Sequence, residues 1–438
     1  MITKFFKMKN IKQLLPSIFL IIVFFNCQAQ NHDYCLQNVS IIDVTGKGGL
    51  LTNMDVYIKN DRISKINKSG KKGAEQAGEI INGEGKFLMP GLADMHVHIP
   101  KENTERFLLF NLAAGVTAVR SMRGDTSHLL LKRKIENEEI PGPVLFLSAP
   151  PFHPKTNIKK EALSQTILEY KKEGFDLIKV LGIPDTAYFE ALMQAANNAE
   201  ILVAGHVPKQ IPVERVIQSG YSCIEHLEGL IEIYQKDTAA ITSILEKLKN
   251  KGVYNCPTLD WYNIGYMQLS LDELKKREGL EYVNEEQINK WIKRIEDYNA
   301  KQNLRDKDSV RAEQVQERKY IQDKLQLVKK LNDIGAFLLL SPDATGAFGV
   351  PGFSMFEEMK LYSKAGIANK DILKIATYNP ALYFGQADKW GSVNSGLKAN
   401  LILLSENPLV SIENIQYQEA VFINGKYFKT EELKNRLK

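Results

Sequence analysis

Short apolar segments separated by turn residues occupy both ends of the chain. Gly, Asn and Asp separate these segments, a pattern that predicts antiparallel β structure. The N-terminal segments are residues 39–43, 55–58, 62–66 and 79–81. The C-terminal segments are residues 401–404 and 420–426. Neither set has enough strands to bury a core alone, so we expect both ends to pair into one composite β-sandwich domain, residues 36–88 plus 391–430.

The middle of the chain alternates continuous apolar runs with stretches of helical periodicity. Continuous apolar runs are typical of parallel strands that are covered on both faces. Eight strand candidates can be marked: Leu88–His98, Val116–Met122, Val144–Pro150, Leu177–Leu181, Ile201–Val207, Ser222–Leu227, Val253–Leu259 and Phe337–Asp343. Eight βα units in this length predict an α/β fold, a (β/α)8 TIM barrel over residues 89–390.

One stretch interrupts this rhythm. Residues 268–330 are dense in Lys, Glu, Arg, Asp and Gln with helical spacing, as in Leu271–Lys276. Such a stretch usually forms a solvated helical face. Because it follows the seventh strand candidate, it lies beside the C-terminal mouth of the expected barrel. It is either a helical lid over that mouth or a surface insertion without a role in the site.

Length and composition limit the possible classes. The chain has 438 residues, is 44% hydrophobic and carries a formal net charge of +5, so a large core with a smaller second domain fits. Basic residues are not interleaved with aromatic ones in a stripe, so we expect no nucleic-acid partner. Four cysteines are too few for a disulfide scaffold. Cys223 and Cys256 lie in apolar runs and are expected to be core thiols.

The first 29 residues are typical of a signal peptide. Four lysines precede an apolar run over residues 14–25, which is too short to span a bilayer comfortably. Cys27 is a possible lipidation site, although Phe24 and Phe25 depart from the usual lipoprotein pattern. Cleavage after Ala29 and an uncleaved anchor are the alternatives. We therefore expect an exported protein that is periplasmic or anchored to a membrane by a lipid on Cys27.

His96 and His98 stand at the end of the first strand candidate. Side chains alternate along a strand, so both imidazoles point to the same side, one pleat apart. Two imidazoles in this arrangement can hold one metal ion, most often Zn²⁺. The alternative is a pair of ordinary core or surface histidines, and the rest of the chain has to decide between these readings.

Further polar residues stand in or at the ends of four other strand candidates: Lys179, His206, His226 and Asp343. The histidines offer neutral nitrogen ligands and the aspartate offers an anionic oxygen. Burial depresses the pKa of a lysine such as Lys179, and a neutral amine can react with CO₂ to give an anionic carbamate. The alternative for Lys179 is an ion-paired or snorkelling lysine.

The ordered set of His96, His98, Lys179, His206, His226 and Asp343 resembles the metal-site pattern of the amidohydrolase superfamily. The similarity is greatest to the binuclear, metal-dependent branch with prolidase-like and imidazolonepropionase-like members. Ala376–Ala381 and Gly391–Leu401 also resemble segments of that family, and the resemblance spans residues 36–430. His-x-His alone is a weak signal, whereas the ordered set is a strong one.

This resemblance implies a two-metal site. His96, His98 and Asp343 would hold one divalent ion, with Zn²⁺ as the expected metal, and His206 and His226 would hold the other. The resemblance further implies that carbamylated Lys179 and a hydroxide bridge the two ions. The hydroxide would attack the carbonyl of a small amide or a dipeptide-like substrate. Asp343 would act as general base and then as general acid toward the leaving amine.

Five further residues are candidates for substrate contact: Arg120, His153, Trp261, Tyr262 and Phe356. Arg120 lies at the mouth of the second strand candidate and is able to bind a substrate carboxylate through two hydrogen bonds. His153 follows the third strand candidate, and Trp261 and Tyr262 follow the seventh. Phe356 stands where relatives commonly have His, which suggests a more apolar pocket.

Other functions are compatible with parts of this pattern. A lactonase or esterase would use the same metal site. A deaminase of this superfamily usually has Glu three residues after the third His, whereas Lys209 stands at that place after His206. A non-catalytic surface-binding protein would be expected to lack ligands, and none is missing. The sequence leaves open the substrate, the native metal and the oligomeric state.

Overall fold

The computed structural model describes residues 32–45, 49–70 and 76–438. The predicted signal peptide, residues 1–29 with Cys27, lies outside the described residues. Within the described ranges, no helix is both long and apolar enough to cross a membrane. The helices that flank the strands are α1 (Thr104–Ala113), α2 (Ser127–Glu136), α3 (Leu163–Glu173), α4 (Thr186–Asn198), α5 (Val213–Gln218), α6 (Leu230–Lys236), α7 (Ala240–Asn250), α8 (Leu259–Gly265), α12 (Ser354–Lys364), α13 (Asn369–Tyr383) and α14 (Thr430–Asn435).

Strands from both chain ends share one eight-stranded sheet. They are β1 (His32–Asp43), β2 (Gly49–Lys59), β3 (Arg62–Lys68), β4 (Ala77–Asn82), β5 (Phe87–Pro90), β13 (Leu401–Leu404), β14 (Gln418–Ile423) and β15 (Lys426–Lys429). The order is β15-β14-β13-β5-β1-β2-β3, and β4 also pairs with β1. The join between the two ends is β5 with β13, an antiparallel pair.

This sheet folds back on itself. The first half of β1 pairs with β4 and its second half pairs with β5. Tyr34 on β1 and Phe422 on β14 pack edge to face with ring centroids 5.9 Å apart. Two strands separate β1 from β14 along the hydrogen-bonded path, so a flat sheet would hold them about 14 Å apart. Side chains from the N-terminal strands and from the C-terminal strands therefore enclose a shared apolar core.

The chain leaves this sheet at Gly91. The run Leu88–His98, which we predicted as one strand, is divided into β5 and β6 (Leu92–Val97). A Cβ atom at Gly91 would lie 2.3 Å from the Thr117 side chain. Only glycine allows this close approach, so it marks the passage from the composite sheet to the parallel strands.

The central strands form two parallel sheets. One has the order β6-β7-β8, with β7 at Val116–Ser121 and β8 at Val144–Leu147. The other has the order β12-β11-β10-β9. Its strands are β9 (Leu177–Val180), β10 (Leu202–Gly205), β11 (Cys223–Glu225) and β12 (Tyr254–Cys256). Seven of the eight predicted central strands are thus present, most of them shorter than predicted.

Single contacts join these two sheets into a ring. A parallel bridge pairs Ser148 with Leu177, and another pairs Asn255 with Leu338. The N–H of Met95 on β6 donates to the carbonyl of Leu340, 3.1 Å away. The eighth predicted strand, 337–343, closes the ring through these isolated contacts and forms no regular strand.

Small and apolar side chains fill the inside of the ring. They include Met95, Ala118, Leu177, Ala204, Cys223, Cys256 and Leu339. Cys223 and Cys256 are free thiols within this core, as predicted. Because side chains alternate along a strand, the residue two places further along lies on the same side. These next residues are Arg120, Lys179, His206 and Glu225, which form a polar layer above the apolar one.

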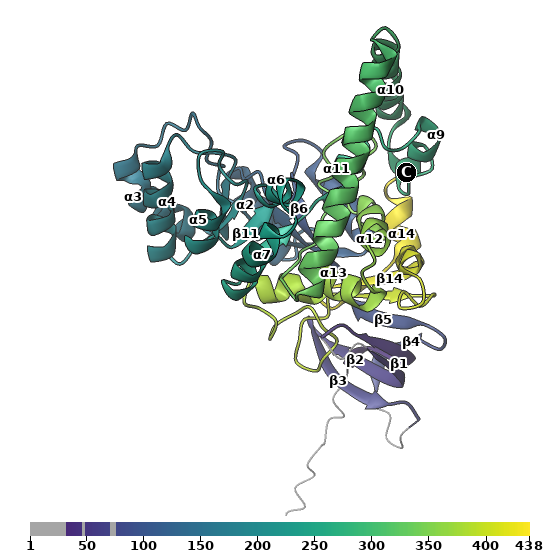
Figure 1. Cartoon of the computed structure of the whole chain (residues 1–438). Helices are drawn as coiled ribbons and strands as arrows, with labels where there is room; N and C mark the ends of the chain where they lie inside the picture. The colour runs from purple at the N-terminus through teal and green to yellow at the C-terminus, as the bar shows by residue number, and fades with distance from the viewer. Residues whose placement is uncertain (1–31, 46–48, 71–75) are drawn as a thin grey trace, which may run out of the picture.

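The charged insertion contains α9 (Leu271–Leu274), a 3-10 turn at Leu280–Tyr282, α10 (Glu285–Asn303) and α11 (Lys307–Asp333). Helix α10 and the first part of α11 project from the body on the side away from β1–β3 (Figure 1). One face of the last third of α11 is buried, and it includes Ile321, Leu325, Val328 and Leu331. The final turns of the predicted insertion, residues 268–330, thus pack one face against the body.

Candidate metal centre

The end of β6 places two imidazoles over the ring. His96 is 1% exposed and His98 is partly exposed, and their rings stack with centroids 5.5 Å apart. The register with β7 shifts between Asp94 and Val97. Asp94 holds this irregular backbone, because its Oδ1 accepts hydrogen bonds from the N–H of His96 (3.3 Å) and the hydroxyl of Ser341 (2.5 Å). Asp94 thereby fixes the approach of β6 to the site.

Asp343 lies between the two imidazoles. Its Oδ2 is 3.9 Å from His96 Nε2, and its Oδ1 is 3.7 Å from His98 Nε2. Its φ of 48° is left-handed, a conformation that costs free energy for an aspartate. Burial raises the pKa of the Asp343 carboxyl to about 6, while the Lys179 ammonium opposes this shift. Strain and a perturbed pKa together are typical of a functional carboxylate.

His206 and His226 complete the group of histidines. The ring centroids are 4.9 Å apart for His96 and His226 and 5.0 Å apart for His206 and His226. One ligand-type atom each from His96, His226 and Asp343 lies within 4.8 Å of the others. This spacing is close to that of a metal site, where ligand atoms lie about 2.0–2.2 Å from the ion.

Three of these histidines have a hydrogen-bonding partner at Nδ1. The pairs are His96 with Glu225 Oε2 (2.7 Å), His226 with Thr258 Oγ1 (2.6 Å) and His206 with Glu228 Oε1 (3.0 Å). Partners of this kind orient a metal-binding imidazole and leave Nε2 for the ion. Glu225, Thr258 and Glu228 were not predicted. The sequence contains one indication of these partners, which is the charged Glu225 next to His226 in an otherwise apolar run.

Burial keeps the imidazoles in the neutral form that binds metals. Burial lowers the pKa of His96 and of His226 well below the usual value, and neighbouring cationic groups add to the effect. The pKa of His98 falls to about 4, again chiefly through burial and then through Lys179 and Arg123. Neutral nitrogen ligands are therefore present throughout the physiological pH range.

Lys179 on β9 provides the test of whether the site suits metal ions. Its side chain is 1% exposed, and its Nζ has no hydrogen-bond partner among the described residues. Burial lowers the pKa of the Lys179 amine. A buried, unsatisfied ammonium is costly. An amine converted to an anionic carbamate would instead be a ligand for metal ions and would be satisfied by them. The donor set of imidazoles, Asp343 and Lys179 thus fits a divalent metal pair.

Arg120 does not face the substrate, contrary to our prediction. Its side chain is fully buried, its Nη2 donates to Glu225 Oε1 (2.7 Å), and its Nε donates to the carbonyl of Met95 (2.6 Å). The guanidinium also lies over the Tyr383 ring. It therefore supports Glu225, which in turn orients His96, and it has no accessible face for a substrate carboxylate.

The prediction that Phe356 lines a more apolar pocket is also contradicted by the structure. It is 4% exposed on α12 and packs edge to face with Phe353, ring centroids 6.1 Å apart. It does not line the cavity beside His98. Helix α12 turns this side chain into the core, so the difference from relatives at this position changes packing and not the pocket wall.

Three substrate-contact predictions remain predictions. His153 is exposed in a turn near the end of β9, and its Nδ1 accepts the N–H of Lys155 at 3.2 Å. Trp261 is 40% exposed and borders a small cavity that also touches Asp343. Tyr262 packs edge to face on His226, with ring centroids 6.3 Å apart. All three lie near the carboxyl ends of the parallel strands.

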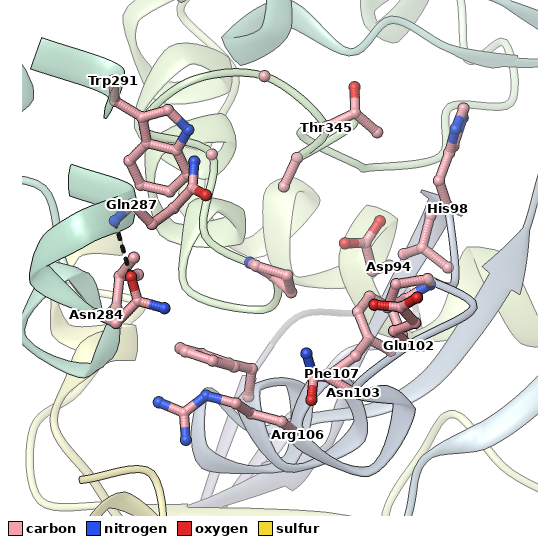
Figure 2. Close-up of a pocket in the computed structure, with 18 residues that line it drawn as sticks. Asp94, His98, Glu102, Asn103, Arg106, Phe107, Asn284, Gln287, Trp291 and Thr345 are labelled. Atoms are coloured by element: carbon pink, nitrogen blue, oxygen red, sulfur yellow. Dashed lines mark hydrogen bonds between the residues drawn. The ribbon is translucent and has the colours of Figure 1, made fainter. Parts of the chain in front are cut away.

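A cavity of about 450 Å³ opens beside His98. His98, Asp94 and Glu102 lie on one side of it, and Trp291, Gln287 and Asn284 of α10 lie on the opposite side (Figure 2). Phe107 and Arg106 form its floor in this view, below Thr345. The start of α10 thus contributes a wall, so the insertion borders the cavity next to the candidate ligands.

Residues 87–428 match the amidohydrolase family. The chain belongs to the amidohydrolase family. The resemblance inferred from the ordered ligands is thereby confirmed, and the assignment supports a hydrolase acting on carbon–nitrogen bonds. A dihydroorotase from Carboxydothermus hydrogenoformans is 30% identical over 210 residues, which cover 44% of this chain and 46% of that protein. The match thus spans about half the length of this curated relative.

Solved structures share the fold over nearly the whole chain. A Xaa-Pro dipeptidase with bound methionine has a TM-score of 0.67 at 18% identity, and the alignment covers 90% of this chain and 99% of that one. A bottromycin amidohydrolase has a TM-score of 0.72 at 22% identity, with 92% and 88% covered. An ochratoxinase from A. niger has a TM-score of 0.64 at 17% identity, with 91% and 96% covered. These identities establish similarity of fold.

Proposed function

We propose that the chain is a metal-dependent amidohydrolase that hydrolyses the C–N bond of a small amide or dipeptide-like substrate. The observation that carries this proposal is the convergence of His96, His98, His226 and Asp343 at one end of the ring of strands. We also propose that the ring is a (β/α)8 barrel and that the folded eight-stranded sheet is a β-sandwich. Function in such barrels gathers at the carboxyl ends of the strands.

The residues present suit two divalent ions. His96, His98 and Asp343 would hold one, and His206 and His226 would hold the other, with Lys179 as a carbamate between them. Imidazole and carboxylate ligands favour Zn²⁺ among the available metals. Ions bound there would supply a Lewis acid and water of lowered pKa.

Asp343 is the residue placed to move protons. Its carboxylate oxygens lie 3.9 Å from His96 Nε2 and 3.7 Å from His98 Nε2, and its pKa of about 6 is close to neutral pH. A carboxylate with this pKa accepts a proton from attacking water and returns it to the leaving amine nitrogen. The cavity beside His98 would receive one substituent of the substrate, since its volume suits a small molecule.

A hydrolysis screen of the purified, metal-loaded protein tests this proposal. Dipeptides, N-acyl amino acids, cyclic amides and lactones are compared, with metal content measured in parallel. Cleavage of an amide, together with about two metal ions per chain, is expected, and Asp343→Asn is expected to abolish it. Turnover of lactones alone would favour the lactonase alternative, and absence of any bound metal would overturn the proposal.

Metal loading is expected to weaken below pH 6. The Asp343 carboxyl has its pKa raised from 3.8 to about 6, so it becomes protonated below that pH and loses its ligand electron pair. The pKa of His98 is about 4, so this ligand stays neutral over the same range. Chelator competition from pH 5 to pH 8 measures the affinity of metal-free protein for Zn²⁺.

Asp343→Asn is the control for this titration, because the amide has no proton to lose between pH 5 and pH 8. The variant is expected to bind more weakly and to lose the step near pH 6. A wild-type affinity that is unchanged down to pH 5 would contradict the assignment of Asp343 as a ligand.

Trp291→Ala is expected to raise KM about 10-fold for substrates with a large apolar group, with kcat nearly unchanged. Trp291 lines the cavity opposite His98 and packs on Phe348, ring centroids 5.5 Å apart. Its loss removes binding surface without touching the candidate ligands. Steady-state kinetics on a pair of large and small substrates measures the effect. Leu304→Ala is the control, because Leu304 is 88% exposed on the same insertion, and an equal KM rise there would refute the role of Trp291.

We further propose that the protein is exported, on the basis of the basic and apolar stretches within residues 1–29. The mass of the mature N-terminus tests this proposal. A lipid-modified Cys27 or a start at residue 30 would support it, and an intact Met1 on a chain that is not bound to membranes would refute it.

A further inference from the structure

Lys324 on α11 is a fully buried lysine outside the set of candidate ligands. Its Nζ donates a hydrogen bond to the backbone carbonyl of His226. The same Nζ lies 3.7 Å from the centre of the Tyr262 ring and 5.2 Å from that of Tyr320. A buried amine is costly unless it is satisfied, so a Leu or Met would be the cheaper filling for this space. Packing alone therefore does not explain a lysine at this position.

The backbone that Lys324 contacts is strained. His226 has φ 63° and the next residue, Leu227, has φ 60°. Left-handed conformations are unfavourable for residues other than glycine and persist only where surrounding contacts hold them. β11 ends at Glu225, so the carbonyl of His226 lies beyond the regular ladder. A buried carbonyl in that position needs a donor, and the Lys324 amine provides one.

Two other contacts fix the same residue. The N–H of His226 donates to the carbonyl of Cys256 at 2.8 Å, and its Nδ1 shares a hydrogen bond with Thr258 Oγ1 at 2.6 Å. Tyr262 lies between Lys324 and the His226 ring, in contact with both. His226 is thus held at its amide, its carbonyl and its ring. The carbonyl contact is the one made by the helix that continues into the insertion (Figure 1).

We propose that Lys324 is a positioning residue for the metal centre, which fixes the His226 peptide and so aims its Nε2 at the second metal ion. It thereby couples the His206–His226 half of the centre to the insertion helix. The inference rests on the proposed function, because it takes His226 as a ligand. It does not involve His96 and His98, whose supports are Glu225 and Asp94.

Lys324→Met tests the proposal, because Met keeps the length and the apolar stem of lysine and removes the donor. We expect one of the two metal ions to bind about 10- to 100-fold more weakly, the range typical of lost outer-sphere support. The other ion should keep its affinity, and excess metal should restore turnover. Chelator competition with Zn²⁺ and metal analysis after gel filtration measure both ions. Lys319→Met is the matched control, because Lys319 is an exposed lysine on the same helix, paired with Asp323.

Two further variants keep the outcome decisive. Thr258→Val removes the ring contact and leaves α11 intact, and the same single ion should weaken. Lys324→Gln is one bond too short to bring its N–H donor to the His226 carbonyl, so it should weaken the same ion and decides the matter if Lys324→Met does not fold. A wild-type chain without metal would sink the proposed function. Two wild-type ions with unchanged affinity in both Lys324 variants, or equal weakening of both ions, would sink the inference alone.

Discussion

Lys179→Met is expected to lower kcat/KM by about 10³-fold and to release at least one metal ion per chain. The Nζ of Lys179 is buried and has no hydrogen-bond partner among the described residues, in the midst of the candidate ligands. Met fills the same space but cannot form a carbamate. Loss of Lewis-acid assistance removes several kcal/mol of transition-state stabilisation, which corresponds to about 10³ in rate.

Two comparisons separate this role from packing. Lys179→Glu supplies a carboxylate directly, so it should retain more metal than Lys179→Met, although its shorter reach limits turnover. Lys132→Met is the control, because Lys132 is a partly buried lysine on α2 that pairs with Asp176, and this variant should keep full metal content. Full activity with two bound ions in Lys179→Met would show that Lys179 is a structural lysine.

The candidate ligands could be recognised in the sequence because their residue types are rare in apolar runs. His96, His206, His226 and Asp343 each follow such a run, and a parallel ring brings the carboxyl ends of its strands together. Each of these residues can be recognised from its own segment of sequence, without knowledge of the other strands. The structure adds the spacing, with imidazole rings about 5 Å apart.

The residues behind the ligands could not be predicted in the same way. Arg120 and Glu225 stand on β7 and β11, 105 residues apart, and meet only across the ring. In strands covered on both faces, alternation between apolar and polar positions is hidden, so inward and outward positions cannot be told apart. The sequence therefore predicted Arg120 as a substrate contact at the mouth of its strand. Similarly, the direction of Phe356 depends on how α12 packs.

The predicted strand Leu88–His98 is divided in the structure for a steric reason. The break at Gly91 depends on the nearby Thr117 side chain, which no local pattern reveals. The buried turns of α11 carry charged residues, and Lys324 alone would have argued for an exposed face. Its partner is a carbonyl 98 residues away. Long-range contacts thus decide which face of α11 is buried.

Arg120→Met is expected to destabilise the fold by about 3–5 kcal/mol, because it leaves the carboxylate of Glu225 buried without its cation. Both side chains are fully buried, and the Nη2–Oε1 distance is 2.7 Å. Urea denaturation monitored by circular dichroism measures the change. The exposed pair Arg215–Glu190 has a similar distance of 2.6 Å. Arg215→Met should therefore leave the free energy of unfolding nearly unchanged.

The double variant Arg120→Met/Glu225→Leu separates stability from function. Removing both charges should recover most of the lost stability, since apolar replacement of a buried pair is often neutral or stabilising. The variant also removes the acceptor of His96 Nδ1, 2.7 Å away in the wild type. Metal affinity should therefore stay about 10- to 100-fold reduced while the fold is restored. If affinity returned together with stability, Glu225 would be a partner of Arg120 only, and the orientation of His96 would depend on its backbone and its packing.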